Sequence, residues 1–289
     1  MLALIRWLSR RPLRFLHALG AGLGWLTFLL SPTYRRRLGA NATQAGLDAR
    51  QRRRSVAEAG RLVAEMPWLW LRPASRPIAD WVEWQGAELI DRALDEGRGL
   101  VLLTPHLGCF EVCAQGYAER FGARQPITAL YSPARQPWLR TLEEGARQRS
   151  GLLTAPASLA GVRQMLRALR KGECVGLLPD QVPPQGMGVW APFFGRPAYT
   201  MTLAAKLVLQ SGAPLLVMWG ERLDGGRGWR LRVDATPPLP TAVEGGDAAL
   251  QQACASVINA EMERLIRRRP EQYLWSYNRY KQPRAELAR

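Results

Sequence analysis

The chain has 289 residues, of which 47% are hydrophobic and 22% are charged. This balance excludes a disordered, collagen-like or low-complexity chain, because enough apolar surface is available to offset the entropy that folding costs. The formal net charge of +16 predicts an anionic partner such as nucleic acid, anionic lipid or an acidic carrier protein. Residues 1–54 contain eleven arginines and a single acidic residue, Asp48, so much of the excess charge is N-terminal.

An apolar segment near the N-terminus is the first predicted element. Residues Phe15 to Leu30 contain no Asp, Glu, Lys or Arg, and arginines flank them on both sides. A helix of this length extends about 24 Å at about 1.5 Å per residue, whereas the hydrocarbon core of a bilayer is about 30 Å thick. We therefore predict a membrane anchor that is embedded, tilted or interfacial, held against an anionic leaflet by its arginines. We place this anchor at residues 1–37 and one further domain at residues 38–289.

Two alternatives compete for the apolar segment. A secretory signal peptide is disfavoured because no small-residue cleavage site is followed by a mature-looking start, and the basic run at 34–37 would impede export. An ordinary core helix stays open, because Gly20, Gly22 and Gly24 are residues at which two helices can pack closely. His17 lies inside this segment and therefore outside the domain expected at residues 38–289.

The rest of the chain alternates helical patterns with short apolar runs, which is typical of an α/β domain. No repeat and no Pro/Ser-rich linker divides it. We expect three layers, with a mixed central sheet flanked by helices. The predicted helices are 51–71, 88–96, 107–121, 159–171, 200–211 and 248–268, and the predicted strands are 99–104, 127–131, 174–178, 214–219 and 229–234.

The four cysteines predict neither a metal site nor a disulfide scaffold. They lack the paired short spacings of a zinc site, and four in 289 residues are too few for a disulfide-rich domain. We interpret them as reduced core residues in a cytoplasmic protein, and we expect no metal and no other cofactor. The four are Cys109, Cys113, Cys174 and Cys254.

The segment Thr104–Glu111 joins a predicted buried strand to a predicted helix, where active sites of open α/β sheets gather. His106 and Glu111 are five positions apart, which would place them about 140° apart on one continuous helix. We therefore expect His106 in the entry loop, from which Glu111 in the following turn can reach one imidazole nitrogen. The other nitrogen can then take a proton from a hydroxyl, as in a His–acid dyad. A capping or structural histidine is the alternative.

Further candidate residues follow along the chain. Asp180, in Leu178-Pro-Asp-Gln181 at the end of another predicted strand, either caps the next element or belongs to the site. Arg147 and Arg149 form an anion clamp or a solvated face. Motifs for a nucleophilic serine, a P-loop and a dinucleotide are missing from the sequence. His106 is the one histidine outside the apolar segment, so histidine catalysis in the domain depends on it.

His106–Glu111 resembles the His-x4-Asp/Glu box of the lysophospholipid acyltransferase superfamily. With four further motifs in the same order, the chain is similar over nearly its whole length to the late acyltransferases of lipid A biosynthesis, the lauroyl, myristoyl and palmitoleoyl transferase family. One departure is Tyr131-Ser-Pro133, where many members carry Tyr-Arg-Pro. The four motifs are Met165–Glu173 running into Pro179–Gln181, Ala191–Gly195, Ala198–Thr200, and Glu271–Trp275 with Arg279 and Lys281.

The resemblance implies a three-layer, glycerolipid-acyltransferase-like fold with an N-terminal membrane-anchoring helix. It implies transfer of a fatty acyl chain from acyl carrier protein to a hydroxyl of a lipid A precursor, at the cytoplasmic face of the inner membrane. It also implies that His106 is the general base, that Glu111 is its partner, and that Asp180 with Arg147 or Arg149 supports substrate binding. The implied partners are acyl carrier protein, the lipid A precursor and the anionic inner membrane, without nucleic acid.

Two other functions stay open. One is an acyltransferase of the same superfamily that acts on another phospholipid or glycolipid. The other is a non-catalytic basic protein that binds nucleic acid or an anionic membrane. The binding protein would explain the charge, but it would not explain why a lone histidine stands beside an acid at a strand-to-helix junction.

Overall fold

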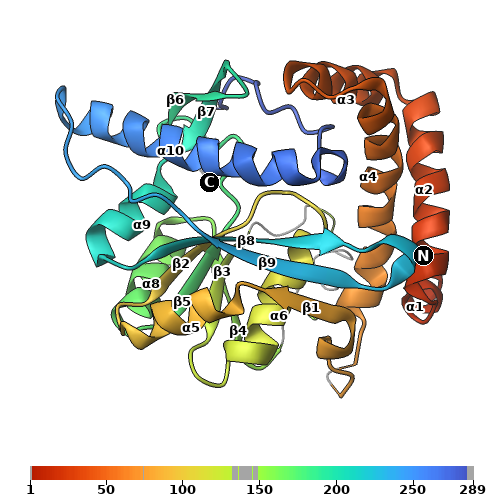
Figure 1. The fold of residues 1–289 in the computed structure, drawn as a ribbon, viewed down its shortest axis with the longest axis horizontal. Helices are drawn as coiled ribbons and strands as arrows, with labels where there is room; N and C mark the ends of the chain where they lie inside the picture. Colours follow the sequence, from red (N-terminus) through yellow and green to blue (C-terminus); the bar gives the residue numbers. More distant parts are fainter. Residues whose placement is uncertain (1, 74, 132–135, 137–144, 146–148, 285–289) are drawn as a thin grey trace.

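The computed structural model of the chain describes residues 2–284 except 74, 132–135, 137–144 and 146–148. A seven-stranded mixed sheet in the order β1-β9-β8-β2-β5-β3-β4 forms its centre (Figure 1). Neighbouring strands are parallel except β8 and β9, which are antiparallel. The strands are β1 (Val82–Gln85), β2 (Leu100–Leu103), β3 (Ile127–Tyr131), β4 (Leu152–Pro156), β5 (Cys174–Leu177), β8 (Leu215–Arg222) and β9 (Trp229–Ala235), and a separate hairpin contains β6 (Gly188–Phe193) and β7 (Arg196–Met201).

Helices cover both faces of the sheet, and the sequence of β2 shows why. All four residues of β2 are buried, and successive side chains of a strand point to opposite faces. Leu100 and Leu102 join the core cluster under α5 and α6, whereas Val101 and Leu103 join the cluster under α8, α9 and α10. The three predicted layers and the mixed sheet are thus confirmed. The helices are α1 (Leu2–Ser9), α2 (Leu13–Leu30), α3 (Pro32–Gln44), α4 (Ala49–Trp70), α5 (Ala87–Asp95), α6 (Phe110–Phe121), α8 (Leu159–Arg170), α9 (Leu203–Ser211) and α10 (Gly246–Arg268).

Two predicted helices begin later than the sequence pattern indicated. The helix expected from residue 107 begins at Phe110, because Gly108 adopts φ +60° and its N–H donates to the Gln272 carbonyl. The helix expected from residue 200 begins at Leu203, because Thr200 still belongs to the hairpin strand β7, where Arg279 donates to its hydroxyl. In both places a contact with a distant segment replaces helical hydrogen bonds.

The predicted apolar segment forms α2, and one face of this helix packs closely on α4 (Figure 1). A Cβ atom added to Gly20 would lie 2.6 Å from the Gly60 carbonyl oxygen, and one added to Gly24 would lie 2.3 Å from the Val56 carbonyl oxygen. The close packing that the core-helix alternative expected is therefore present at Gly20 and Gly24. It does not extend to Gly22, where an added Cβ would have no neighbour within 4 Å.

The opposite face of α2 is exposed and apolar. Among the described residues α2 is the one helix long and apolar enough to cross a membrane, and 28% of it is buried in the protein. The exposed apolar side chains of α1 and α2 are Leu4, Trp7, Phe15, Leu19, Leu23, Trp25, Leu26, Leu29 and Leu30. One helix thus combines a packed glycine face with an exposed apolar face. The expected boundary between residues 37 and 38 falls inside α3, so the limits of a separate anchor stay a prediction.

Candidate active site

His106 lies in the loop between β2 and α6, and hydrogen bonds to distant segments hold the main chain of this loop. Its carbonyl oxygen accepts a hydrogen bond from Leu274, and the N–H of Cys109 donates 2.8 Å to the Gly220 carbonyl of β8. Gly108 is required here, because a Cβ atom at this positive φ would lie 2.0 Å from the Gly220 oxygen. The loop therefore presents the His106 side chain from a fixed main chain, as a reaction that depends on geometry requires.

Asp180 holds the imidazole of His106. It follows β5, the strand next to β2, and the carboxyl ends of parallel neighbours meet at one edge of the sheet. Its Oδ1 lies 2.7 Å from Nδ1 of His106, and its Oδ2 accepts the main-chain N–H of His106 at 2.9 Å. The side chain of Asp180 is 1% exposed and that of His106 is 14% exposed. One carboxylate thus fixes both the ring and the main chain of the histidine.

The electrostatic surroundings keep Asp180 ionised. Burial alone would raise the pKa of this carboxyl, but the attraction of His106, the two hydrogen bonds from that residue and the nearby guanidinium of Arg279 outweigh it and lower the pKa below its usual value. Burial and the negative charge of Asp180 in turn raise the pKa of the Tyr273 phenol well above its usual value. The site therefore offers an anion opposite Nδ1, which stabilises a positively charged imidazole.

The side chain of Gln181 contacts the other ring nitrogen of His106. Its side-chain amide nitrogen lies 2.9 Å from Nε2 of His106. An amide N–H donates, so Nε2 accepts with its lone pair, while Nδ1 carries the proton and donates to Asp180. This is the tautomer of a general base that accepts a proton at Nε2. The sequence predicted no role for Gln181, although its position next to Asp180 at the end of a strand was the available signal.

The remaining predicted site residues differ in where the structure places them. Glu111 is the second residue of α6, and the imidazole of His106 is hydrogen-bonded to Asp180 and Gln181. Its role as partner of His106 stays a prediction. Arg147, like Ser132 and Pro133 of the Tyr131-Ser-Pro133 departure, lies outside the described residues.

Arg149 is described, and it lies away from His106. It precedes β4, so it is at the amino-terminal edge of a sheet whose carboxyl edge holds His106 and Asp180. Its guanidinium donates to the carbonyl oxygens of Leu69 and Arg72 at the end of α4, at 3.2 and 2.9 Å. These contacts cap the end of α4. The predicted role of Arg149 in substrate binding stays a prediction.

The cysteines are free and buried, as predicted. Cys109 and Cys113 are the two nearest to His106 in sequence, and burial raises the pKa of each thiol, that of Cys109 well above its usual value. A buried thiol with a raised pKa supplies little thiolate, which is the nucleophilic form. The surroundings of these two residues therefore disfavour a covalent acyl-cysteine intermediate.

Comparison with known proteins decides the class of enzyme. Residues 1–282 match the family described as bacterial lipid A biosynthesis acyltransferase. The chain belongs to this family. It is 28% identical to the lipid A biosynthesis lauroyltransferase of Escherichia coli K12, over 96% of this chain and 89% of that protein. It is 29% identical to the lipid A biosynthesis palmitoleoyltransferase of the same organism, over 81% of this chain and 73% of that protein.

A third relative extends the comparison beyond one organism. A lipid A biosynthesis acyltransferase of Haemophilus influenzae is 31% identical over 67% of this chain and 57% of that protein. The chain is therefore an acyltransferase of lipid A biosynthesis, as the resemblance implied. The alternative of a non-catalytic basic binding protein is wrong.

Proposed function

We propose that this lipid A acyltransferase takes a fatty acyl chain from acyl carrier protein and transfers it to a hydroxyl of a lipid A precursor, with His106 as general base. The observation that carries the proposal is the pair of contacts at the imidazole, Asp180 at Nδ1 and Gln181 at Nε2. A substrate hydroxyl that displaces the Gln181 amide would meet the lone pair of Nε2 directly.

The reaction balances without a covalent enzyme intermediate. Nε2 of His106 removes the proton of the acceptor hydroxyl as the oxygen attacks the thioester carbonyl, and the Asp180 carboxylate stabilises the imidazolium that forms. Collapse of the tetrahedral intermediate forms the ester and breaks the carbon–sulfur bond, and the imidazolium returns the proton to the departing thiolate. The resemblance gave the partner role to Glu111. We assign it to Asp180, which touches Nδ1, and keep Glu111 as the alternative that variants decide.

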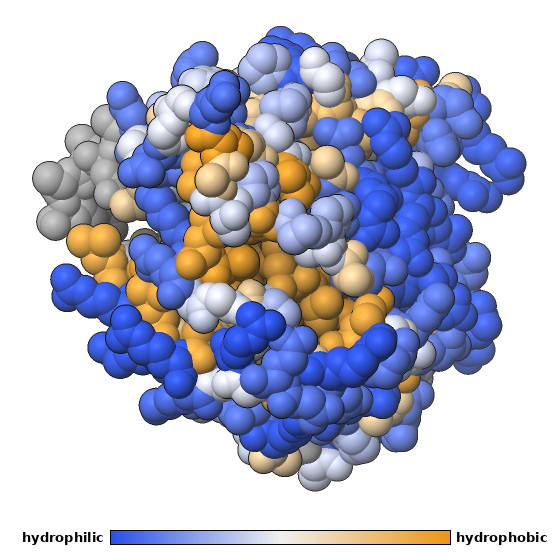
Figure 2. Space-filling view, turned by 60° about the vertical axis from the view of Figure 1, so that its left-hand side comes forward, coloured by the Kyte–Doolittle hydropathy of each residue, from blue (hydrophilic) through white to orange (hydrophobic). Residues whose placement is uncertain are grey.

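The surface of the protein suits both proposed substrates. Carrier proteins of this kind are acidic and lipid A precursors are phosphorylated, and an arginine-rich protein can bind both through charge and bidentate hydrogen bonds. Figure 2 shows an apolar area between polar side chains on the face turned forward from the left of Figure 1. Exposed apolar residues of the elements on that side are Leu159 of α8, Met187 before β6, Trp190 of β6 and Leu209 of α9. We propose that acyl chains bind to this area.

We further propose that the protein works on the cytoplasmic face of the inner membrane, held there by α1 and α2. The exposed apolar side chains of these helices, with Arg10, Arg14 and Arg35 exposed beside them, fit the interface of an anionic leaflet. Deletion of residues 1–37 should release the chain from membranes in fractionation. Recovery of the full-length chain in the soluble fraction without detergent would contradict this proposal.

One experiment tests the reaction itself. The purified full-length chain is incubated with acyl-carrier-protein donors of several chain lengths and a lipid A precursor, beside acyl-coenzyme A donors of the same lengths, and the products are read by mass spectrometry. We expect one added acyl ester from a carrier-protein donor and none with His106→Ala. Transfer from coenzyme A alone would refute the proposed donor, and an active His106→Ala would refute the proposed base.

A further inference from the structure

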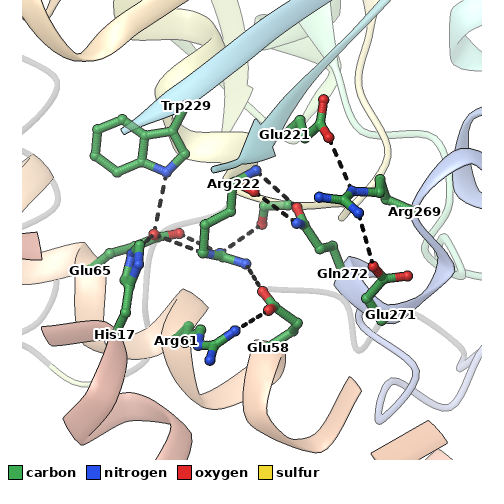
Figure 3. Close-up of polar contacts among 11 residues, drawn as sticks. His17, Glu58, Arg61, Glu65, Glu221, Arg222, Trp229, Arg269, Glu271 and Gln272 are labelled. Atoms are coloured by element: carbon green, nitrogen blue, oxygen red, sulfur yellow. Dashed lines mark hydrogen bonds and ion pairs between the residues drawn. The ribbon is translucent and has the colours of Figure 1, made fainter. Parts of the chain in front are cut away.

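A second buried cluster of charges lies between the N-terminal helices and the end of β8 (Figure 3). It brings together His17 of α2, Glu58 and Glu65 of α4, Arg222 of β8 and Trp229 of β9. Glu65 is 0% and Arg222 2% exposed. The proposed reaction uses none of these side chains, and burying so many charges is costly unless each is paired.

Arg222 is the centre of the cluster. Its Nε donates to Oε2 of Glu65 at 2.9 Å, its Nη2 donates to Oε1 of the same carboxylate, and its Nη1 donates to Oε2 of Glu58 at 2.7 Å. Burial alone would lower the pKa of Arg222, but the two carboxylates outweigh burial and raise it. The planar guanidinium therefore binds β8 to two carboxylates that lie about two turns apart on α4.

The same residue reaches the loop that carries His106. Nη2 of Arg222 donates to the carbonyl oxygen of Gly108 at 3.3 Å. The main-chain N–H of Arg222 donates to Oε1 of Gln272 at 2.9 Å, and Nε2 of Gln272 donates back to the Arg222 carbonyl at 3.0 Å. The Gln272 carbonyl in turn accepts the N–H of Gly108 at 3.0 Å. Arg222 and Gln272 thus hold both main-chain polar groups of Gly108, two residues after His106.

We propose that Arg222 is a positioning residue for acyl transfer, which holds the His106 loop in register with α4 and, through Glu65, with His17 of α2. The inference rests on His106 being the general base. A lysine keeps the positive charge of Arg222 but presents one ammonium in place of a fork, so it cannot bind Glu58, Glu65 and the Gly108 carbonyl together. Small displacements of a catalytic group lower the rate of the chemical step more than they weaken substrate binding.

The test compares Arg222→Lys with Leu169→Ala in the full-length protein in detergent, below the melting temperature of both variants. Leu169 is buried in α8 beside Gly99, before the start of β2 and away from the His106 loop. We expect Arg222→Lys to lower kcat by about tenfold or more, with KM for donor and acceptor within about twofold of wild type. Leu169→Ala should lower the melting temperature and leave kcat unchanged.

Other outcomes overturn the proposal in distinguishable ways. A kcat of Arg222→Lys equal to that of Leu169→Ala, or a rise in KM alone, would make Arg222 purely structural. If Arg222→Lys does not fold, Gln272→Met, which loses both side-chain bonds to the Arg222 main chain, replaces it with the same criteria. If His106→Ala is inactive and the kcat of Arg222→Lys equals that of wild type, only the positioning role of Arg222 is rejected. If His106→Ala is active, the role of His106 as general base is rejected.

Discussion

The protein has two histidines, and each is paired with a buried carboxylate. Nδ1 of His106 lies 2.7 Å from Asp180, and Nε2 of His17 lies 3.0 Å from Glu65. Both imidazoles are mostly buried, with 14% and 8% of the side chain exposed. Taken alone, the two pairs have the composition of a catalytic dyad.

The two pairs differ in the hydrogen-bond partners of the carboxylate. Both oxygens of Asp180 accept hydrogen bonds from His106, and an amide that substrate can displace occupies the second ring nitrogen. The Oε2 atom of Glu65, by contrast, is shared among His17, Arg222 and Trp229 (Figure 3). A carboxylate already bound by a guanidinium stabilises an imidazolium less. A His–acid pair therefore indicates catalysis when both oxygens of the carboxylate bind the histidine and the second ring nitrogen is accessible to a substrate.

The largest expected effect separates the two histidines directly. His106→Ala should lower kcat by about 10²- to 10⁴-fold, because a general base contributes that much. His17→Ala should act mainly on the melting temperature, because it removes one partner of a buried carboxylate. Steady-state kinetics and thermal unfolding of both variants in the same detergent decide this. Equal losses of kcat would abolish the distinction between the pairs.

The next expected effect concerns which acid orients His106. Asp180→Asn should lower kcat by about 10²-fold or more, because the amide cannot fix the Nδ1–H tautomer or stabilise the imidazolium. Glu111→Gln should lower kcat less, since the hydrogen bond to Nδ1 comes from Asp180. Single-turnover rates at saturating donor and acceptor measure both variants. A larger loss in Glu111→Gln would restore the His106–Glu111 dyad that the resemblance implied.

The central strands and the helices packed on them were predicted well from the sequence, because the spacing of apolar residues follows which side chains are buried. The strand at Ile127–Tyr131 and the helix from Leu159 lie where their patterns placed them. The predictions omitted β1 and β4, which are the two edge strands of the sheet. β1 has no fully buried residue, and β4 is interrupted by exposed positions and ends in a proline. Neither strand forms the continuous apolar run that marks the central strand β2.

The candidate site shows the same limit. Placing His106 and Asp180 at strand ends followed from the sequence, because the carboxyl ends of parallel strands share an edge. Spacing along the chain favoured Glu111, five residues from His106, whereas the observed partner is 74 residues away. Arg222 was not predicted, because its contacts to Glu65 and Gly108 cross 157 and 114 residues of sequence. Contacts across such separations are set by packing that no local pattern reports.

The Glu65 cluster should also appear in the acid stability of the protein. Burial would raise the pKa of Glu65, but Arg222 and His17 outweigh it and lower the pKa from 4.5 to about 2. A carboxyl with a depressed folded-state pKa contributes stability above its ordinary value and loses it as the pH falls toward the folded value. The contribution is about 3 kcal/mol at neutral pH, at about 1.4 kcal/mol per pKa unit.

Glu65→Gln tests this contribution. The variant should be less stable than wild type at pH 7, and the difference should shrink as the pH falls through the window between 4.5 and about 2. Thermal unfolding of both proteins across this range measures the difference. A difference that stays constant with pH would show that Glu65 contributes through shape alone, which would weaken the contrast with Asp180.

The smallest expected effect tests whether close packing of α2 on α4 brings His17 to Glu65. A Cβ atom at Gly60 would lie 1.9 Å from the Gly20 carbonyl oxygen and 2.7 Å from the Gly24 nitrogen. Both are main-chain atoms that cannot rotate away, so Gly60→Ala must separate the helices. Overpacking of this kind costs about 1–3 kcal/mol. Gly22→Ala is the matched control, because its added Cβ has no neighbour within 4 Å.

Gly22→Ala should leave stability unchanged or raise it by up to about 1 kcal/mol, through the higher helix propensity of alanine. Gly60→Ala should lower the free energy of unfolding and should cost less kcat than Arg222→Lys. The reason is that Glu58 and Glu65 both belong to α4, so their bonds to Arg222 survive a shift of α2. A loss of kcat in Gly60→Ala as large as in Arg222→Lys would mean that α2 itself, and not Arg222 alone, holds the His106 loop in place.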